Sequence, residues 1–130
     1  MAQRPAPLWQ PVRQLPFVAA LIDDLSHAAE KQHQALQRAR DGTNVLDEYA
    51  LRQIIDVYSR QREDLSVFGE QLQRWLALDL SETQGDEIQR LSSRLNRLHE
   101  VVPAILTMAE ELKSRIIRDL AQKHRSPYTF

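Results

Sequence analysis

The chain has 130 residues, the size of one ordinary domain, and its 17 basic and 18 acidic residues give a formal net charge of −1. This balance provides no overall field that would hold a polyanion, so the composition argues against nonspecific nucleic-acid binding. The sequence contains no cysteine, which excludes disulfides, thiolate metal sites and cysteine nucleophiles. Hydrophobic residues make up 42% of the chain, enough for a folded protein with one core.

Residues 1–16 are expected to form an extended arm, because proline removes a backbone donor and biases the preceding residue away from helical geometry. The prolines of this segment are Pro5, Pro7, Pro11 and Pro16. The apolar run over residues 17–22 is too short for a signal sequence or a membrane span. We therefore expect a cytoplasmic protein in which residues 17–125 form one helical domain and residues 126–130 a flexible tail.

Apolar residues at steps of three and four predict a first helix between Pro16 and Gly42, with Gly42 as its stop. A second helix should start after Thr43 or Asn44, either of which can cap it. Its apolar positions follow a heptad pattern that is interrupted once, at polar residues 61 and 62. The stripe comprises Leu51, Ile54, Ile55, Tyr58, Leu65, Phe68, Leu72, Trp75 and Leu76.

The third helix has the most regular apolar stripe. Ser81 and Gln84 form a capping-box signature at its start. The stripe comprises Ile88, Leu91, Leu95, Leu98, Val102, Ile105, Ala109, Leu112, Ile116 and Leu120. Pro103 lies inside this run and predicts a kink rather than a break, because the stripe keeps its phase across the proline.

Short connections near residues 41–44 and 79–82 make neighbouring helices antiparallel, so the sequence predicts an all-α, up-down-up three-helix bundle with coiled-coil-like packing and long second and third helices. In this arrangement the tip of the second hairpin projects about 12 Å beyond the start of the first helix. Trp75, Leu76 and Leu91 lie on that projection. We expect either Leu8 and Trp9 of the arm or a second chain to cover them.

Residues 101–109 of the third helix are almost entirely apolar and carry no charge. A helix that faces one core needs only part of its circumference apolar, so this segment predicts either an interface or a deep central layer surrounded by the other helices. The candidate interface residues are Val101, Ile105, Leu106 and Met108, together with Trp75, Leu76 and Trp9.

The sequence gives no grounds for an enzyme or a cofactor. Glu30 and His33 form one Glu-x-x-His pair, whereas a di-iron bundle requires two such pairs and further carboxylates. His27, His99 and His124 belong to no recognisable nucleophile or acid–base arrangement. We expect no catalytic residue, no bound metal and no cofactor.

Five basic residues near the end of the third helix are candidates for anion contacts. They are Lys113, Arg115, Arg118, Lys123 and Arg125. Glu110, Glu111 and Asp119 dilute this charge, and no aromatic residue lies among the five, so a solvated helix face is the favoured interpretation.

The leading hypothesis is a non-enzymatic protein–protein interaction module that forms a homodimer or holds another helical protein, with self-association through the third helix. Long amphipathic helices with free ends resemble the layout of export chaperones and adaptor bundles, which is a similarity of architecture alone. Two alternatives are a small nucleic-acid-associated regulator that uses the basic end of the third helix and a metal-binding bundle centred on Glu30 and His33.

Overall fold

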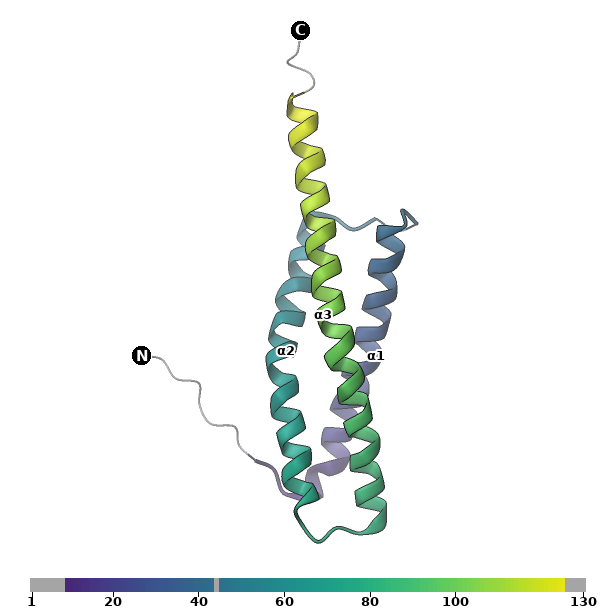
Figure 1. Ribbon diagram of the computed structural model, residues 1–130, viewed down its shortest axis with the longest axis vertical. Coiled ribbons are helices and arrows are strands. Elements are labelled where there is room, and N and C mark those ends of the chain that lie inside the picture. The colour runs from purple at the N-terminus through teal and green to yellow at the C-terminus, as the bar shows by residue number, and fades with distance from the viewer. Residues whose placement is uncertain (1–8, 44, 126–130) are drawn as a thin grey trace, which may run out of the picture.

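The computed structural model describes residues 9–43 and 45–125, which fold into three helices. The elements in chain order are a 3-10 turn (Val12–Gln14), α1 (Leu15–Arg40), α2 (Glu48–Leu76) and α3 (Glu82–Arg125). Consecutive helices run in opposite directions (Figure 1), which confirms the predicted all-α three-helix bundle. The described residues contain no strand. The expectations for Leu8 and for residues 126–130 lie outside the described residues.

Local sequence signals set the helix ends. The Asp47 carboxylate accepts a hydrogen bond from the backbone N–H of Ala50 at 2.7 Å and caps α2, so the cap lies later in the chain than the expected Thr43 or Asn44. Ser81 and Gln84 form the expected capping box of α3. The Gln84 N–H donates to the Ser81 hydroxyl at 3.2 Å, and the Ser81 N–H donates to the Gln84 side-chain oxygen at 3.0 Å.

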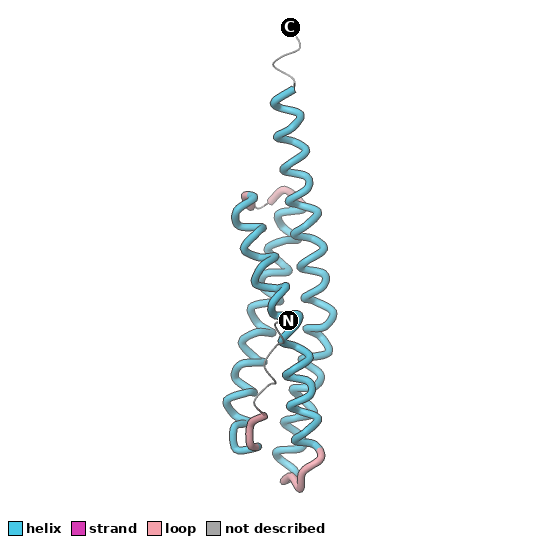
Figure 2. The backbone as a smooth tube through the Cα atoms, turned by 90° about the vertical axis from the view of Figure 1, so that its left-hand side faces the viewer, coloured by secondary structure: helices cyan, strands magenta, loops and turns pink. Residues whose placement is uncertain are grey.

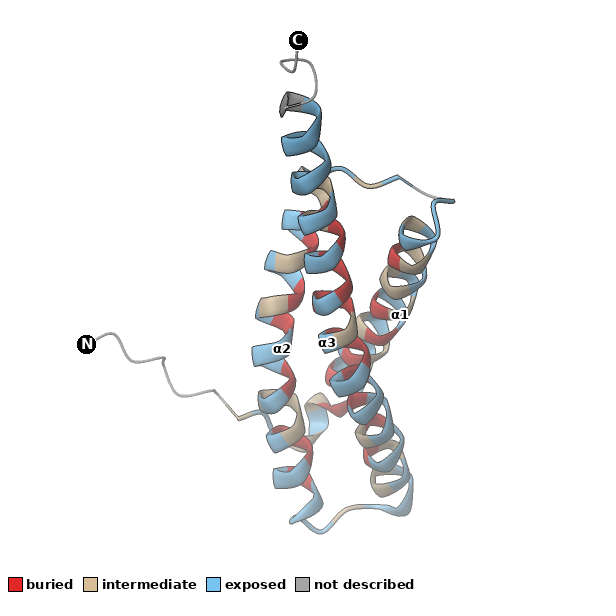
Figure 3. Ribbon diagram, turned by 45° about the horizontal axis from the view of Figure 1, so that its top comes forward, coloured by how far each residue is buried: buried red, intermediate tan, exposed pale blue. Residues whose placement is uncertain are grey.

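The third helix is the centre of the bundle. α3 packs along both α1 and α2, whereas α1 and α2 make few contacts with each other. The residues coloured as buried lie on the facing sides of the helices (Figure 3), and their side chains form one core cluster. The tube in Figure 2 shows α3 extending well beyond the ends of the other two helices. None of the described helices is both long and apolar enough to cross a membrane.

α3 continues through Pro103 as one helix of 44 residues. The proline is exposed, so its missing backbone hydrogen bond lies on the side of the helix that faces water. The absence of a break agrees with the unbroken phase of the apolar stripe. The kink near Pro103 stays a prediction.

A buried polar layer crosses the bundle where α1 meets α2. The Tyr58 hydroxyl donates to the Ala28 carbonyl at 3.5 Å. Close to this level, Ser26 Oγ and Gln61 Oε1 are buried without a hydrogen-bond partner among the described residues. Gln61 therefore occupies a core position, as the interrupted heptad pattern indicates, and an unsatisfied buried oxygen there costs stability.

Candidate functional site

The apolar segment of α3 over residues 101–109 belongs to the core. Val101, Ile105, Leu106 and Met108 are each at most 9% exposed. Because α3 lies between α1 and α2, it needs apolar side chains over a wider arc than a helix that faces a single neighbour. The surplus apolar surface that suggested an interface here is thus covered within the chain itself, and the deep central layer is the arrangement found.

Exposed apolar surface appears instead at the far end of α3. α3 has 44 residues and α2 has 29. The last 15 residues of α3 therefore extend about 22 Å beyond the start of α2, at 1.5 Å per residue. We call residues 111–125 the free end of α3 (Figure 1). The apolar stripe continues along it: Ile116 is half-buried, whereas Ile117 is 46% and Leu120 47% exposed.

A small notch lies at the base of the free end, between α3 and the α1–α2 connection. Its volume is about 210 Å³. It is lined by Ala39, Gly42, Val45, Leu46, Leu112, Arg115 and Ile116. Of these residues, Val45 is almost fully exposed. The notch therefore extends the apolar surface of Ile117 and Leu120 onto the end of the bundle.

The free end is positively charged. Five basic residues against Glu111 and Asp119 give residues 111–125 a net charge of +3, and the chain total of −1 leaves −4 for the remainder. Lys113 Nζ lies 3.5 Å from Glu110 Oε2 and forms an ion pair with it. Arg115, Arg118 and Lys123 are exposed and form no ion pair within the described part of the chain, while the side chain of Arg125 lies outside it.

The opposite end of the bundle is closed by the segment before α1. The Gln10 N–H donates to Gln71 Oε1 at 2.7 Å, and the Gln10 carbonyl accepts from Trp75 Nε1 at 2.8 Å and from Gln71 Nε2 at 3.4 Å. The Arg74 guanidinium lies 4.1 Å from the centre of the Trp9 ring, a cation–π contact. Trp75 is consequently buried at 1% exposure.

The arm of the same chain thus covers part of the hairpin end. The ion pairs Asp23–Arg90 and Glu30–Arg97 place the start of α1 about level with the start of α3, so the projection of about 12 Å expected from the sequence is not found. Leu91 is fully buried, whereas Leu76 remains 36% exposed. A groove of about 350 Å³ lies next to the arm, between the first half of α1 and the second half of α2. It is lined by Trp9, Gln10, Gln14, Phe17, Val18, Leu21, Val67, Phe68 and Gln71. Phe17, on its rim, is 63% exposed.

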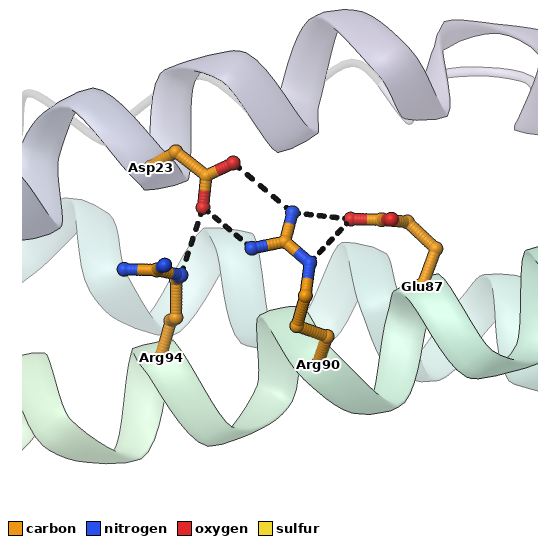
Figure 4. A network of polar contacts seen from close by, with 4 residues as sticks. All are labelled: Asp23, Glu87, Arg90 and Arg94. Carbon is orange, nitrogen blue, oxygen red and sulfur yellow. Dashed lines mark hydrogen bonds and ion pairs between the residues drawn. The ribbon is translucent and has the colours of Figure 1, made fainter.

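A cluster of charged side chains joins α1 to α3 (Figure 4). Arg90 donates to both oxygens of Asp23, at 2.8 and 3.0 Å, and also to Glu87. Arg94 Nε lies 2.9 Å from Oδ1 of the same aspartate. The hydrogen bond from Arg90 holds the pKa of Asp23 below its usual value, and the paired carboxylates raise the pKa of Arg90. The cluster is charge-paired and links α1 to α3.

Glu30 of the Glu-x-x-His pair is also held in an ion pair. Arg97 Nε lies 2.7 Å from Glu30 Oε1, and this hydrogen bond lowers the pKa of Glu30. The described residues contain no group of three or more side chains that could hold a metal ion. We did not anticipate this α1–α3 pairing from the sequence, although the arginines at 90, 94 and 97 repeat at the spacing of one helix face.

No known protein family matches the sequence, and no match is found among curated proteins or solved structures. A proposal for the function therefore depends on the burial, geometry and charge of this chain's own residues.

Proposed function

We propose that the chain is a non-enzymatic protein–protein interaction module, in which the bundle is a base that presents the free end of α3 to a partner. The observation that supports this is the apolar stripe of α3, which continues past both neighbouring helices and leaves Ile117 and Leu120 about half exposed. Water-exposed apolar surface of this kind is unfavourable, at about 25 cal/mol per Å², and marks interfaces on many proteins.

The pattern and charge of the free end favour a helical, acidic partner. Apolar residues at steps of three and four are the pattern by which one helix packs along another. The net charge of +3 on residues 111–125 attracts an acidic helix and makes two free ends repel each other. Another helical protein is therefore favoured over a second copy at this surface, and the cytoplasmic location stays a prediction.

A binding experiment with a designed peptide tests the proposal. The probe is a labelled three-heptad helix with leucine at the core positions and glutamate on the outer face, and the readout is fluorescence anisotropy. We expect binding to the wild type and at least about tenfold weaker binding to the double variant Ile117→Asn, Leu120→Asn, a loss of roughly 1.4 kcal/mol or more.

The matched control carries the same two asparagines at exposed polar residues of the free end, as Ser114→Asn and Gln122→Asn, and should bind like the wild type. Equal binding to both double variants, or no binding to the wild type, would contradict the proposal. A lysine version of the peptide separates charge attraction from apolar contact. Light scattering over a concentration series reports whether Ile117 and Leu120 support a homodimer instead.

The exposed cations favour one further candidate, a nucleic-acid-associated regulator that uses the basic end of α3. Arg115, Arg118 and Lys123 have no ion-pair partner within the described part, so they remain available to phosphate groups. This candidate predicts affinity for duplex DNA or RNA that falls steeply between about 50 and 200 mM salt. An absence of salt-dependent binding removes it. No observation favours the metal-binding alternative, because Glu30 is held by Arg97.

A further inference from the structure

The contact between the arm and α2 resembles the binding of a peptide backbone. Gln71 uses its amide to accept from the N–H of Gln10 and to donate to its carbonyl, as a neighbouring strand would. Trp75 donates to the same carbonyl. These bonds do not depend on the side chain of residue 10, and the ring of Trp9 under Arg74 supplies the side-chain contact.

This contact is separable from the bundle. Between it and α1 lie only Pro11 and the turn Val12–Gln14, none of whose three residues is buried. The turn is held by two backbone hydrogen bonds, from the N–H of Gln14 to the carbonyl of Pro11 at 2.9 Å and from the N–H of Leu15 to the carbonyl of Val12. Val12 packs against the core, whereas Pro11 is exposed, so backbone rotations at residues 10 and 11 can redirect Trp9 and Gln10 while Val12 stays in place.

The same end of the bundle retains exposed apolar side chains. Phe17 is 63%, Leu76 36% and Leu78 52% exposed. Phe17 lines the groove beside Trp9. Leu76 directly follows Trp75, and Leu78 lies two residues further along the chain. A second chain at this end would cover these three side chains. The arm of the same chain, once released, would leave them exposed.

We propose that two copies of the chain exchange arms at their hairpin ends, so that Trp9 and Gln10 of each copy bind Gln71, Arg74 and Trp75 of the other. A second copy is the natural occupant because it carries the segment that the site already holds. Because the contacts are identical within and between chains, protein concentration decides between the closed monomer and the exchanged dimer. The two forms should be equally populated near the millimolar effective concentration of a short tether. Each copy gives one arm and accepts one, which closes the pair with two-fold symmetry. This surface is at the opposite end from the free end of α3 and is independent of it.

A mixing experiment on full-length chains tests the exchange. One chain, labelled with ¹⁵N, carries Trp9→Gly, which weakens its arm and leaves Trp75 as its single tryptophan. The other, unlabelled, carries Gln71→Leu, which weakens its own site and frees an intact arm. Both also carry Ile117→Asn and Leu120→Asn, so that association through the free end does not contribute. At about 1 mM, we expect the Trp75 indole N–H signal to move toward its wild-type position as the unlabelled chain is added.

The control is an unlabelled chain that carries both Trp9→Gly and Gln71→Leu, which should leave the signal in place. No movement with the intact arm, or equal movement with the control, would overturn arm exchange. Movement with a synthetic peptide of residues 5–14 but not with the full-length chain would also overturn it and would assign the site to a segment of another protein. Gln71→Met replaces Gln71→Leu if circular dichroism shows that the leucine variant does not fold.

Discussion

The two ends of the bundle differ in how far the chain covers their apolar side chains. At the hairpin end, α1 begins about level with the start of α3, and the segment before α1 folds back along α2 so that Trp75 is 1% exposed. At the other end α3 projects alone, and Leu120 is 47% exposed. Apolar stripes reach both ends, so the difference lies in whether the chain covers them itself.

This contrast separates stability from function. A side chain that the chain covers contributes to folding in the isolated molecule, whereas a side chain left bare contributes only when something else covers it. We therefore assign Trp75 to the fold, and Ile117 and Leu120 to recognition. Matched substitutions at the two ends measure this division directly.

The largest expected effect is at the covered end. Trp75→Ala should lower the free energy of unfolding by about 3 to 5 kcal/mol, because it removes a fully buried indole and leaves a cavity. Leu120→Ala at the free end should lower it by about 0.5 kcal/mol or less. Urea denaturation of the two variants measures both values. Similar losses would mean that the free end is packed in the isolated chain.

A gain in stability is expected from the polar layer between the ends. Gln61→Leu removes a buried oxygen without a partner in the described residues and should raise the free energy of unfolding by about 1 kcal/mol. Gln53→Leu, at an exposed position of the same helix, is the matched control and should change stability by less. A clear loss of stability in Gln61→Leu would show that this side chain has a partner in solution.

The smallest effect is expected from the charged cluster on the α1–α3 seam. Because the pKa of Asp23 is lowered on folding, its contribution is present above the ordinary pKa of 3.8 and is lost as the pH falls through the lowered value. Asp23→Asn should therefore cost about 0.2 to 1 kcal/mol at pH 7, since the side chains are partly exposed, and nothing in strong acid. Asp24→Asn, on an exposed neighbour, provides the baseline. A cost that persisted in strong acid would contradict the ion-pair origin of the effect.

The fold could be predicted because the apolar period of each helix is long and regular. The capping box at Ser81 and Gln84 was equally clear in the sequence. The cap of α2 was misplaced because Thr43 and Asn44 are as suitable in type as Asp47, and only the path of the connection chooses between them.

The surfaces were harder to predict than the helices. The apolar segment over residues 101–109 was open to two interpretations, because the periodicity of one helix does not tell how many neighbours surround it. The need to cover Trp75 followed from helix lengths, whereas the choice between the arm and a second chain depends on the path of residues 9–14. The stripe beyond Leu112 was taken for core, although comparison of the lengths of α2 and α3 would have placed Leu120 beyond the bundle.

Amide hydrogen exchange along α3 in dilute protein tests the contrast between the two ends most directly. We expect amides of residues 88–98, at the covered end, to exchange only through global unfolding, and amides of residues 117–123 to exchange through local opening at far lower free energy. Protection of the free end equal to that of the covered end, at concentrations where the chain is a monomer, would contradict the claim that α3 ends without a partner.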